Sequence, residues 1–211
     1  MVSFPVMSEI LKPAESDHFE IRHIAITKED LELCILRDAV NGRRDYLGQK
    51  PGTIVQLVRK PALIMMSDTA MERRTSYDIL WHATGHVLIA GLGLGMVALG
   101  IQGKEDVESV TVIEIEPEII DLVVPQLPLN EKVAVVGGDI FTWYPPNGVK
   151  FDTIYFDIWD SMCADNYEEM KRLKRRFARR LNRENPHCWM KCWWEDECRR
   201  EIRRGVHYSW L

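Results

Sequence analysis

From residue 87 onward, short apolar strands alternate with helical segments, and this alternation limits the fold more than any other feature of the 211-residue chain. The strand-like runs span 87–91, 109–115, 132–139, 151–159 and 187–194. Strands that are apolar almost throughout are typical of a parallel sheet that helices cover on both faces. The sequence therefore predicts an α/β fold with a doubly wound, Rossmann-like, mainly parallel sheet.

The first 70 residues follow a different pattern. A β-branched, alternating run at 19–26 predicts a strand, and Thr27 is placed to cap a helix that follows it. Residues 53–67 predict a β-hairpin with Lys60 and Pro61 at its turn. We therefore expect a small, strand-rich N-terminal extension over 1–70 and a Rossmann-like domain over 71–211.

The stretch HVLIAGLGLGMVALG, residues 86–100, runs from an apolar strand through three glycines into a helical segment. Gly91, Gly93 and Gly95 alternate there, and such a turn brings the backbone close to a nucleotide-like ligand. The dinucleotide fingerprint would need a glycine at Met96. No G-K-[ST] follows the glycines either, which excludes a P-loop.

Three further strands end in acids: Glu114, Asp139 and Asp157. Ligands of open α/β sheets bind beyond the carboxyl ends of the strands, so we expect these carboxylates to share one crevice with the glycines. Three acids suit a pyrophosphate poorly. They suit S-adenosylmethionine, which offers ribose hydroxyls to Glu114, an adenine amino group to Asp139, and positive charge; helix N–H groups can take its carboxylate.

Four segments in register, VLIAGLGLG, VTVIEIEPEII, GDIFTW and FDTIYFDIWD, resemble class I S-adenosylmethionine-dependent methyltransferases, and within them the spermidine synthase-like branch. They lie within residues 86–160, about a third of the chain. The resemblance implies S-adenosylmethionine as cofactor. The cofactor-binding residues that it implies are Gly91, Leu92, Gly93, Gly95, Glu114, Ile115, Asp139, Ile140 and Asp157.

The resemblance also implies catalytic roles for Asp157 and Asp160. In polyamine synthases the first acid of such a pair helps to deprotonate the amine, and the second holds its charge. For Asp160 we favour another role, as the N-cap of the following helix. The chain departs from that branch in its GLGLG turn and in DIWDSM, which lacks the usual proline. It also ends soon after the fifth strand, so we expect the usual closing strand pair to be absent.

The sequence is compatible with three functions. The first is a methyltransferase that acts on a small or cationic acceptor. The second is an aminopropyltransferase that uses the decarboxylated cofactor. The third is a non-catalytic module that keeps the cofactor fold.

The segment before the glycine strand is where relatives close over the cofactor. Its polar residues Glu72, Arg73, Arg74 and Tyr77 are candidates to face the site, although we favour a solvated helix start.

Other signals are weaker. The basic run 171–183 favours a solvated helix face that pairs with nearby acids, and the net charge of −5 gives no reason to expect nucleic-acid binding.

His187 and the C-terminal cysteines lack the spacing of a zinc site, so we expect no metal. The C-terminal tryptophans, Trp193 among them, are expected to bury against the sheet or a partner subunit, and a homodimer stays open.

The sequence also predicts a cellular location. The chain shows no secretory signal and no transmembrane run, and its five cysteines suit reduced thiols, so we expect a cytoplasmic protein without membrane attachment.

Overall fold

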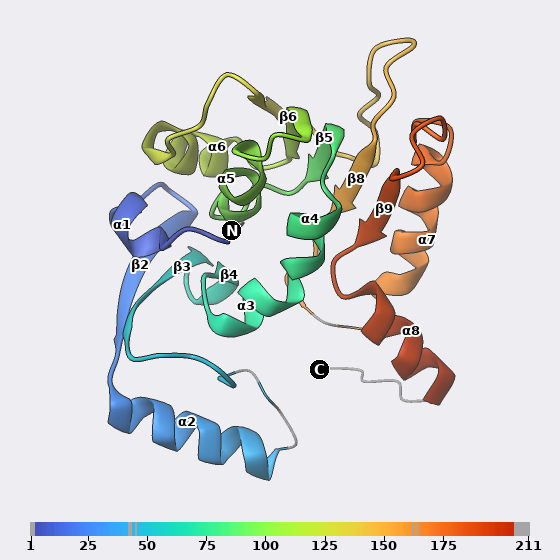
Figure 1. Ribbon diagram of the computed structural model, residues 1–211. Coiled ribbons are helices and arrows are strands. Elements are labelled where there is room, and N and C mark those ends of the chain that lie inside the picture. Colours follow the sequence, from blue (N-terminus) through green and yellow to red (C-terminus); the bar gives the residue numbers. More distant parts are fainter. Residues whose placement is uncertain (1–2, 42–43, 45, 162, 164, 205–211) are drawn as a thin grey trace.

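The computed structural model describes residues 3–41, 44, 46–161, 163 and 165–204. It contains two sheets, an N-terminal antiparallel one and a larger parallel one (Figure 1). The parallel strands, in spatial order, are β7 (Val133–Gly137), β6 (Val107–Glu114), β5 (Gly85–Ala90), β8 (Thr153–Phe156) and β9 (Trp189–Cys192). The predicted doubly wound α/β fold is confirmed.

The central strands of the parallel sheet, β5 and β8, are buried on both faces. In β5, Val87 and Ile89 point to one face while Leu88 and Ala90 point to the other, and all four are at most 1% exposed. Alternate side chains of a strand point to opposite faces, so both sets need a covering layer. This double burial is the reason that residues 87–90 are all apolar.

Helices supply the two covering layers (Figure 1). Apolar side chains of α4 (Tyr77–His82), α5 (Met96–Gln102) and α6 (Pro117–Val123) pack on the Val87 face. The short 3₁₀ helix η1 (Val124–Gln126) follows α6 directly. On the Leu88 face, α7 (Asn166–Phe177) packs through Met170, Leu173 and Phe177, and α8 (Glu195–Arg204) packs beside it through Cys198.

The N-terminal sheet has the order β1-β2-β3-β4, with every neighbouring pair antiparallel. Its strands are β1 (Ala14–Glu15), β2 (Phe19–Ile26), β3 (Gly52–Arg59) and β4 (Leu63–Ser67). The hairpin predicted over 53–67 is β3–β4. The helices of this part are α1 (Met7–Ile10), α2 (Lys28–Val40) and α3 (Ala70–Thr75). Thr27 caps α2 as expected, in a reciprocal capping box with Asp30.

The helix predicted over about 165–183 is shorter than expected, because α7 ends at Phe177. The chain then turns, and the Asn182 N–H donates to the Phe151 carbonyl at 2.8 Å. A contact with the segment before β8 therefore replaces the helical hydrogen bonds that the basic run would otherwise form. No helix in the described part of the chain is long and apolar enough to cross a membrane.

Candidate functional site

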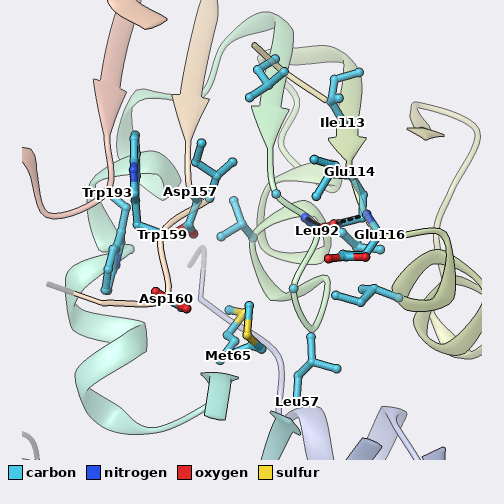
Figure 2. A pocket seen from close by; sticks show the side chains of 18 of the residues that line it. Leu57, Met65, Leu92, Ile113, Glu114, Glu116, Asp157, Trp159, Asp160 and Trp193 are labelled. Atoms are coloured by element: carbon cyan, nitrogen blue, oxygen red, sulfur yellow. Dashed lines mark hydrogen bonds between the residues drawn. The ribbon is translucent and has the colours of Figure 1, made fainter. Parts of the chain in front are cut away.

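A cavity of about 250 Å³ lies at the carboxyl edge of the parallel sheet (Figure 2). The strand order reverses between β5 and β8, and open α/β sheets bind their ligands at this switch point. The glycine turn and the segments after β6, β7 and β8 form one side of the cavity, and β3, β4 and α3 form the other.

Glu114, the last residue of β6, has a preorganised carboxylate. It is 6% exposed, and its two oxygens accept hydrogen bonds from the N–H groups of Leu92 at 2.8 Å and of Glu116 at 2.9 Å (Figure 2). Each carboxylate oxygen can accept more than one hydrogen bond, so the group can still take two hydroxyls. Glu114 therefore both holds the glycine turn in place and presents acceptors to the cavity.

The glycine turn needs Gly91 and Gly93 for different reasons. Gly91 has φ +96°, and a Cβ there would lie 1.9 Å from the backbone oxygen of Asp157, so a side chain would separate the turn from the end of β8. Gly93 has φ +51°, and a Cβ there would meet the Met66 sulfur at 2.2 Å. Gly95 is the N-cap of α5 and is not among the residues that line the cavity.

The segment after β7 closes the far end of the same cavity. Asp139 and Ile140 line it together with Ile115. The Phe141 N–H donates to Asp139 Oδ1 at 2.8 Å, which fixes the carboxylate, and none of the described residues donates to Oδ2. An apolar wall beside a fixed acceptor is suited to a flat ring that carries an amino group.

Two carboxyl groups with raised pKa values lie at the end of the cavity opposite to Asp139. Burial raises the pKa of Asp157, directly after β8, to about 7. Burial and the Asp157 charge raise the pKa of Glu72, on α3, to about 8, while a hydrogen bond from the Ser67 backbone opposes this shift. Carboxyl groups that titrate near neutral pH can exchange protons with an amine, and strongly perturbed acids in a cleft are typical of functional sites.

Aromatic side chains stand beside these acids. Figure 2 shows Asp157, Trp159, Asp160 and Trp193 on the side of the cavity away from Glu114. The Trp193 indole N–H donates to the Thr75 hydroxyl at 2.9 Å, which fixes the ring against α3. Asp160 is exposed, and α7 begins only at Asn166, so the expected N-cap role of Asp160 is wrong.

The antiparallel sheet supplies residues that the sequence did not point to: Leu57, Arg59, Met65 and Met66. The Leu94 N–H donates to the Met66 sulfur at 3.3 Å, so β4 rests directly on the glycine turn. No motif in the sequence indicates this contact, because it depends on how the hairpin docks.

Of the four candidates before β5, only Glu72 lines the cavity. Arg73 donates to Asp68 and to backbone carbonyls near the N-terminus, and Arg74 donates to two carbonyls in the segment after α2. Tyr77 is 44% exposed on α4. The favoured expectation of a solvated helix start therefore describes Tyr77 but not Glu72.

The cavity is strongly acidic. Six carboxyl groups line it, those of Glu72, Glu114, Glu116, Asp139, Asp157 and Asp160. Among the described lining residues, Arg59 is the one cation, and its guanidinium forms a 2.6 Å ion pair with Glu116. Such a site favours a ligand that carries positive charge.

The basic run pairs with acids only in part. Lys171 pairs with Glu168, and Lys174 pairs with Glu195 at 2.8 Å. Arg172 and Arg176 instead lie over the rings of Phe141 and Tyr144. Across the described residues, no arginine of this run has a carboxylate within ion-pair distance.

No protein-family model matches the sequence, and a sequence search of curated proteins finds no match. Parts of several solved structures are similar to this chain. The CcbJ methyltransferase from Streptomyces caelestis is 18% identical at a TM-score of 0.44, over 56% of this chain and 47% of that one. DesVI from Streptomyces venezuelae is 15% identical at a TM-score of 0.42, over 56% and 49%.

The N-methyltransferase NodS from Bradyrhizobium japonicum WM9, in complex with S-adenosyl-L-homocysteine, is 17% identical at a TM-score of 0.43, over 55% of this chain and 59% of that one. The matched regions thus cover about half to three fifths of these three proteins. None of the three is described as a spermidine synthase, and the resemblance to that branch stays a prediction.

Proposed function

We propose that the chain binds S-adenosylmethionine along the carboxyl edge of the parallel sheet and transfers its methyl group to an amine. The observation that carries this proposal is one cavity that gathers the glycine turn, Glu114, Asp139 and Asp157. These residues lie on four different strand ends, and each was expected at the cofactor from its own sequence motif.

The residues of the cavity fit the parts of this cofactor. Glu114 would accept hydrogen bonds from both ribose hydroxyls, Ile115 and Ile140 would enclose the adenine ring, and Asp139 would accept a hydrogen bond from its amino group. The glycine turn, on the side toward Asp157, would hold the methionine part. The six lining carboxyl groups favour a cofactor that carries a sulfonium and an ammonium.

The acceptor enters on the Asp157 side. A bound S-adenosylmethionine supplies an electrophilic methyl group there. The Glu72 and Asp157 pair would take the proton that an amine nitrogen gives up when it accepts this methyl group. Asp160 holds the positive charge of the incoming amine, and the faces of Trp159 and Trp193 favour a cation. The products are the methylated amine and S-adenosylhomocysteine.

One observation favours a second candidate, the transfer of an aminopropyl group from the decarboxylated cofactor. The methionine carboxylate needs a donor, and Arg59, the one cation among the described lining residues, is paired with Glu116. The decarboxylated cofactor has no carboxylate to place. For S-adenosylmethionine, the donors would be backbone N–H groups of the glycine turn, which lines the cavity at Gly91, Leu92 and Gly93.

Isothermal titration of the purified chain with both cofactors tests the proposal. We expect S-adenosylmethionine and S-adenosylhomocysteine to bind, with an affinity that falls when Glu114 is replaced by alanine. Binding of the decarboxylated form alone would favour the second candidate, and binding of neither would overturn the assignment. Tight binding without turnover of any amine in a panel of mono-, di- and polyamines would indicate a non-catalytic module.

A further inference from the structure

The outward face of α2 carries a stripe of aliphatic side chains on which no described residue packs. Leu33 is 68% exposed, Leu36 is 64% exposed and Val40 is 80% exposed. Residues spaced by three and four positions lie on one face of a helix, so these three form a continuous strip. In Figure 1, α2 lies apart from the rest of the molecule.

The opposite face of α2 is the one that packs on the protein. Leu31 belongs to a small apolar cluster with Ile26 and Ile54, and the buried Asp38 carboxylate accepts a hydrogen bond from the Tyr46 N–H at 3.0 Å. These contacts fix the rotation of the helix about its axis. The stripe therefore cannot turn toward the core while Leu31 and Asp38 stay in place.

Single exposed aliphatic residues are ordinary, but a contiguous strip of them marks an interaction surface. The spacing of Leu33, Leu36 and Val40 matches alternate a and d positions of a coiled-coil seam. We propose that a second copy of this chain covers the stripe, and that the two α2 helices pack antiparallel about a twofold axis.

Charge complementarity supports a second copy in this orientation. Asp30 and Arg37 are both exposed, and their spacing of seven residues places them along the same edge of the stripe. In an antiparallel pair, Asp30 of each copy lies beside Arg37 of the other, so the symmetry creates the contact twice. Antiparallel helices also set their dipoles in opposition.

The acidic residues of α2 argue against a membrane surface as the partner that covers the stripe. Amphipathic helices that lie on anionic lipid carry basic residues beside their apolar face. Here the N-terminal half of α2 presents Glu29, Asp30 and Glu32, all of them exposed. A membrane surface would repel that half of the helix.

Two single-helix faces bury less than a standard interface of roughly 1,600 Å², so we expect a dissociation constant in the micromolar range. Sedimentation equilibrium at protein concentrations from about 1 to 500 µM measures this dissociation constant. Leu36→Gln should raise the dissociation constant at least about tenfold. Arg37→Glu should raise it as well, by a factor that shrinks as salt is added.

Ile35→Gln is the matched control. Ile35 is on the same helix and 48% exposed, but it is off the stripe, so its replacement should leave the dissociation constant unchanged. Circular dichroism confirms that each variant keeps its helix content. A wild type that is monomeric at every concentration would overturn the proposal, as would equal effects of Leu36→Gln and Ile35→Gln.

Cysteine cross-linking tests the orientation, in a background with Cys34→Ser. Antiparallel packing predicts that Leu33→Cys protein mixed with Leu36→Cys protein forms a disulfide-linked dimer faster than either variant alone. Faster cross-linking of Leu36→Cys with itself would indicate parallel helices and overturn the proposed arrangement.

Discussion

Glu72 on α3 and Asp157 after β8 line the same cavity, and the charge of Asp157 adds to the burial that raises the pKa of Glu72. The two residues are far apart in the sequence, and they belong to elements on opposite sides of the site. Two carboxyl groups that interact in this way titrate as a pair, and the pair keeps a proton near neutral pH. Because the pair releases this proton at higher pH, the stability of the folded chain should depend on pH.

We expect the free energy of unfolding to fall as the pH rises through about 7 to 8. The pKa of Asp157 is about 7 and that of Glu72 about 8 when the chain is folded, whereas both groups ionise near pH 4 when it is unfolded. Between these values the folded state binds more protons. This contribution is therefore complete below the unfolded pKa values and is lost as the pH passes the folded ones.

Urea unfolding at several pH values between about 5 and 9 measures this slope. Glu72→Gln should flatten it, whereas Glu105→Gln, at an exposed acid outside the cavity, should not. His18, whose pKa Glu118 raises, also loses stabilisation with rising pH, so the informative quantity is the difference between each variant and the wild type. Equal slopes for wild type and Glu72→Gln would contradict the raised pKa.

Asp157→Asn should lower kcat by about 10²–10⁴ and leave cofactor affinity within a few-fold. The amide keeps the size of the side chain but cannot accept the proton of the amine. Asp160→Asn is the comparison: Asp160 is exposed, and its proposed role is to hold the positive charge of the amine, so its replacement should raise KM for the amine and change kcat little. The same kcat for Asp157→Asn and wild type would remove Asp157 from catalysis.

Glu114→Ala should weaken binding of S-adenosylmethionine at least about a hundredfold, because charge-assisted hydrogen bonds contribute about 1.5–3 kcal/mol each. The variant should also melt at a lower temperature, since the N–H groups of Leu92 and Glu116 lose their acceptor. Calorimetric titration and thermal melts separate the two effects. Glu131→Ala, at an exposed acid outside the cavity, is the control, and unchanged affinity of Glu114→Ala would exclude the ribose role.

Gly93→Val should abolish cofactor binding while the far-ultraviolet circular dichroism stays that of the wild type. The backbone at Gly93 has φ +51°, which a β-branched residue rarely adopts, and the new side chain would displace Met66 from the glycine turn. Gly103→Val is the matched control, because Gly103 has φ −85° and no atom within 4 Å of its Cβ position. Full affinity of the folded Gly93→Val protein would show that the glycine serves packing alone.

The sequence by itself determined the parallel sheet and the positions of its strand ends. Apolar runs such as residues 87–91 must be covered on both faces, and this requirement can be read without coordinates. Parallel strands present their carboxyl ends at one edge, so the placement of Gly91, Glu114, Asp139 and Asp157 at that edge followed from the parallel direction of the strands.

Only the tertiary structure decided which other residues enter the cavity. Glu72, Met66 and Trp193 reach it because α3, the β3–β4 hairpin and the segment after β9 dock against the sheet edge. No local pattern encodes such a contact. The N-cap expected at Asp160 failed for the same reason, since the start of α7 at Asn166 depends on how that helix packs on the sheet.

Helix α2 shows most clearly what the local sequence determines and what the tertiary structure determines. Its sequence predicts a helix, and the capping box of Thr27 and Asp30 begins it where expected. The aliphatic residues Leu31, Leu33 and Val40 look alike in the sequence, yet only Leu31 is buried. Helix formation depends on neighbours along the chain, whereas burial depends on which face of the helix another part of the protein covers.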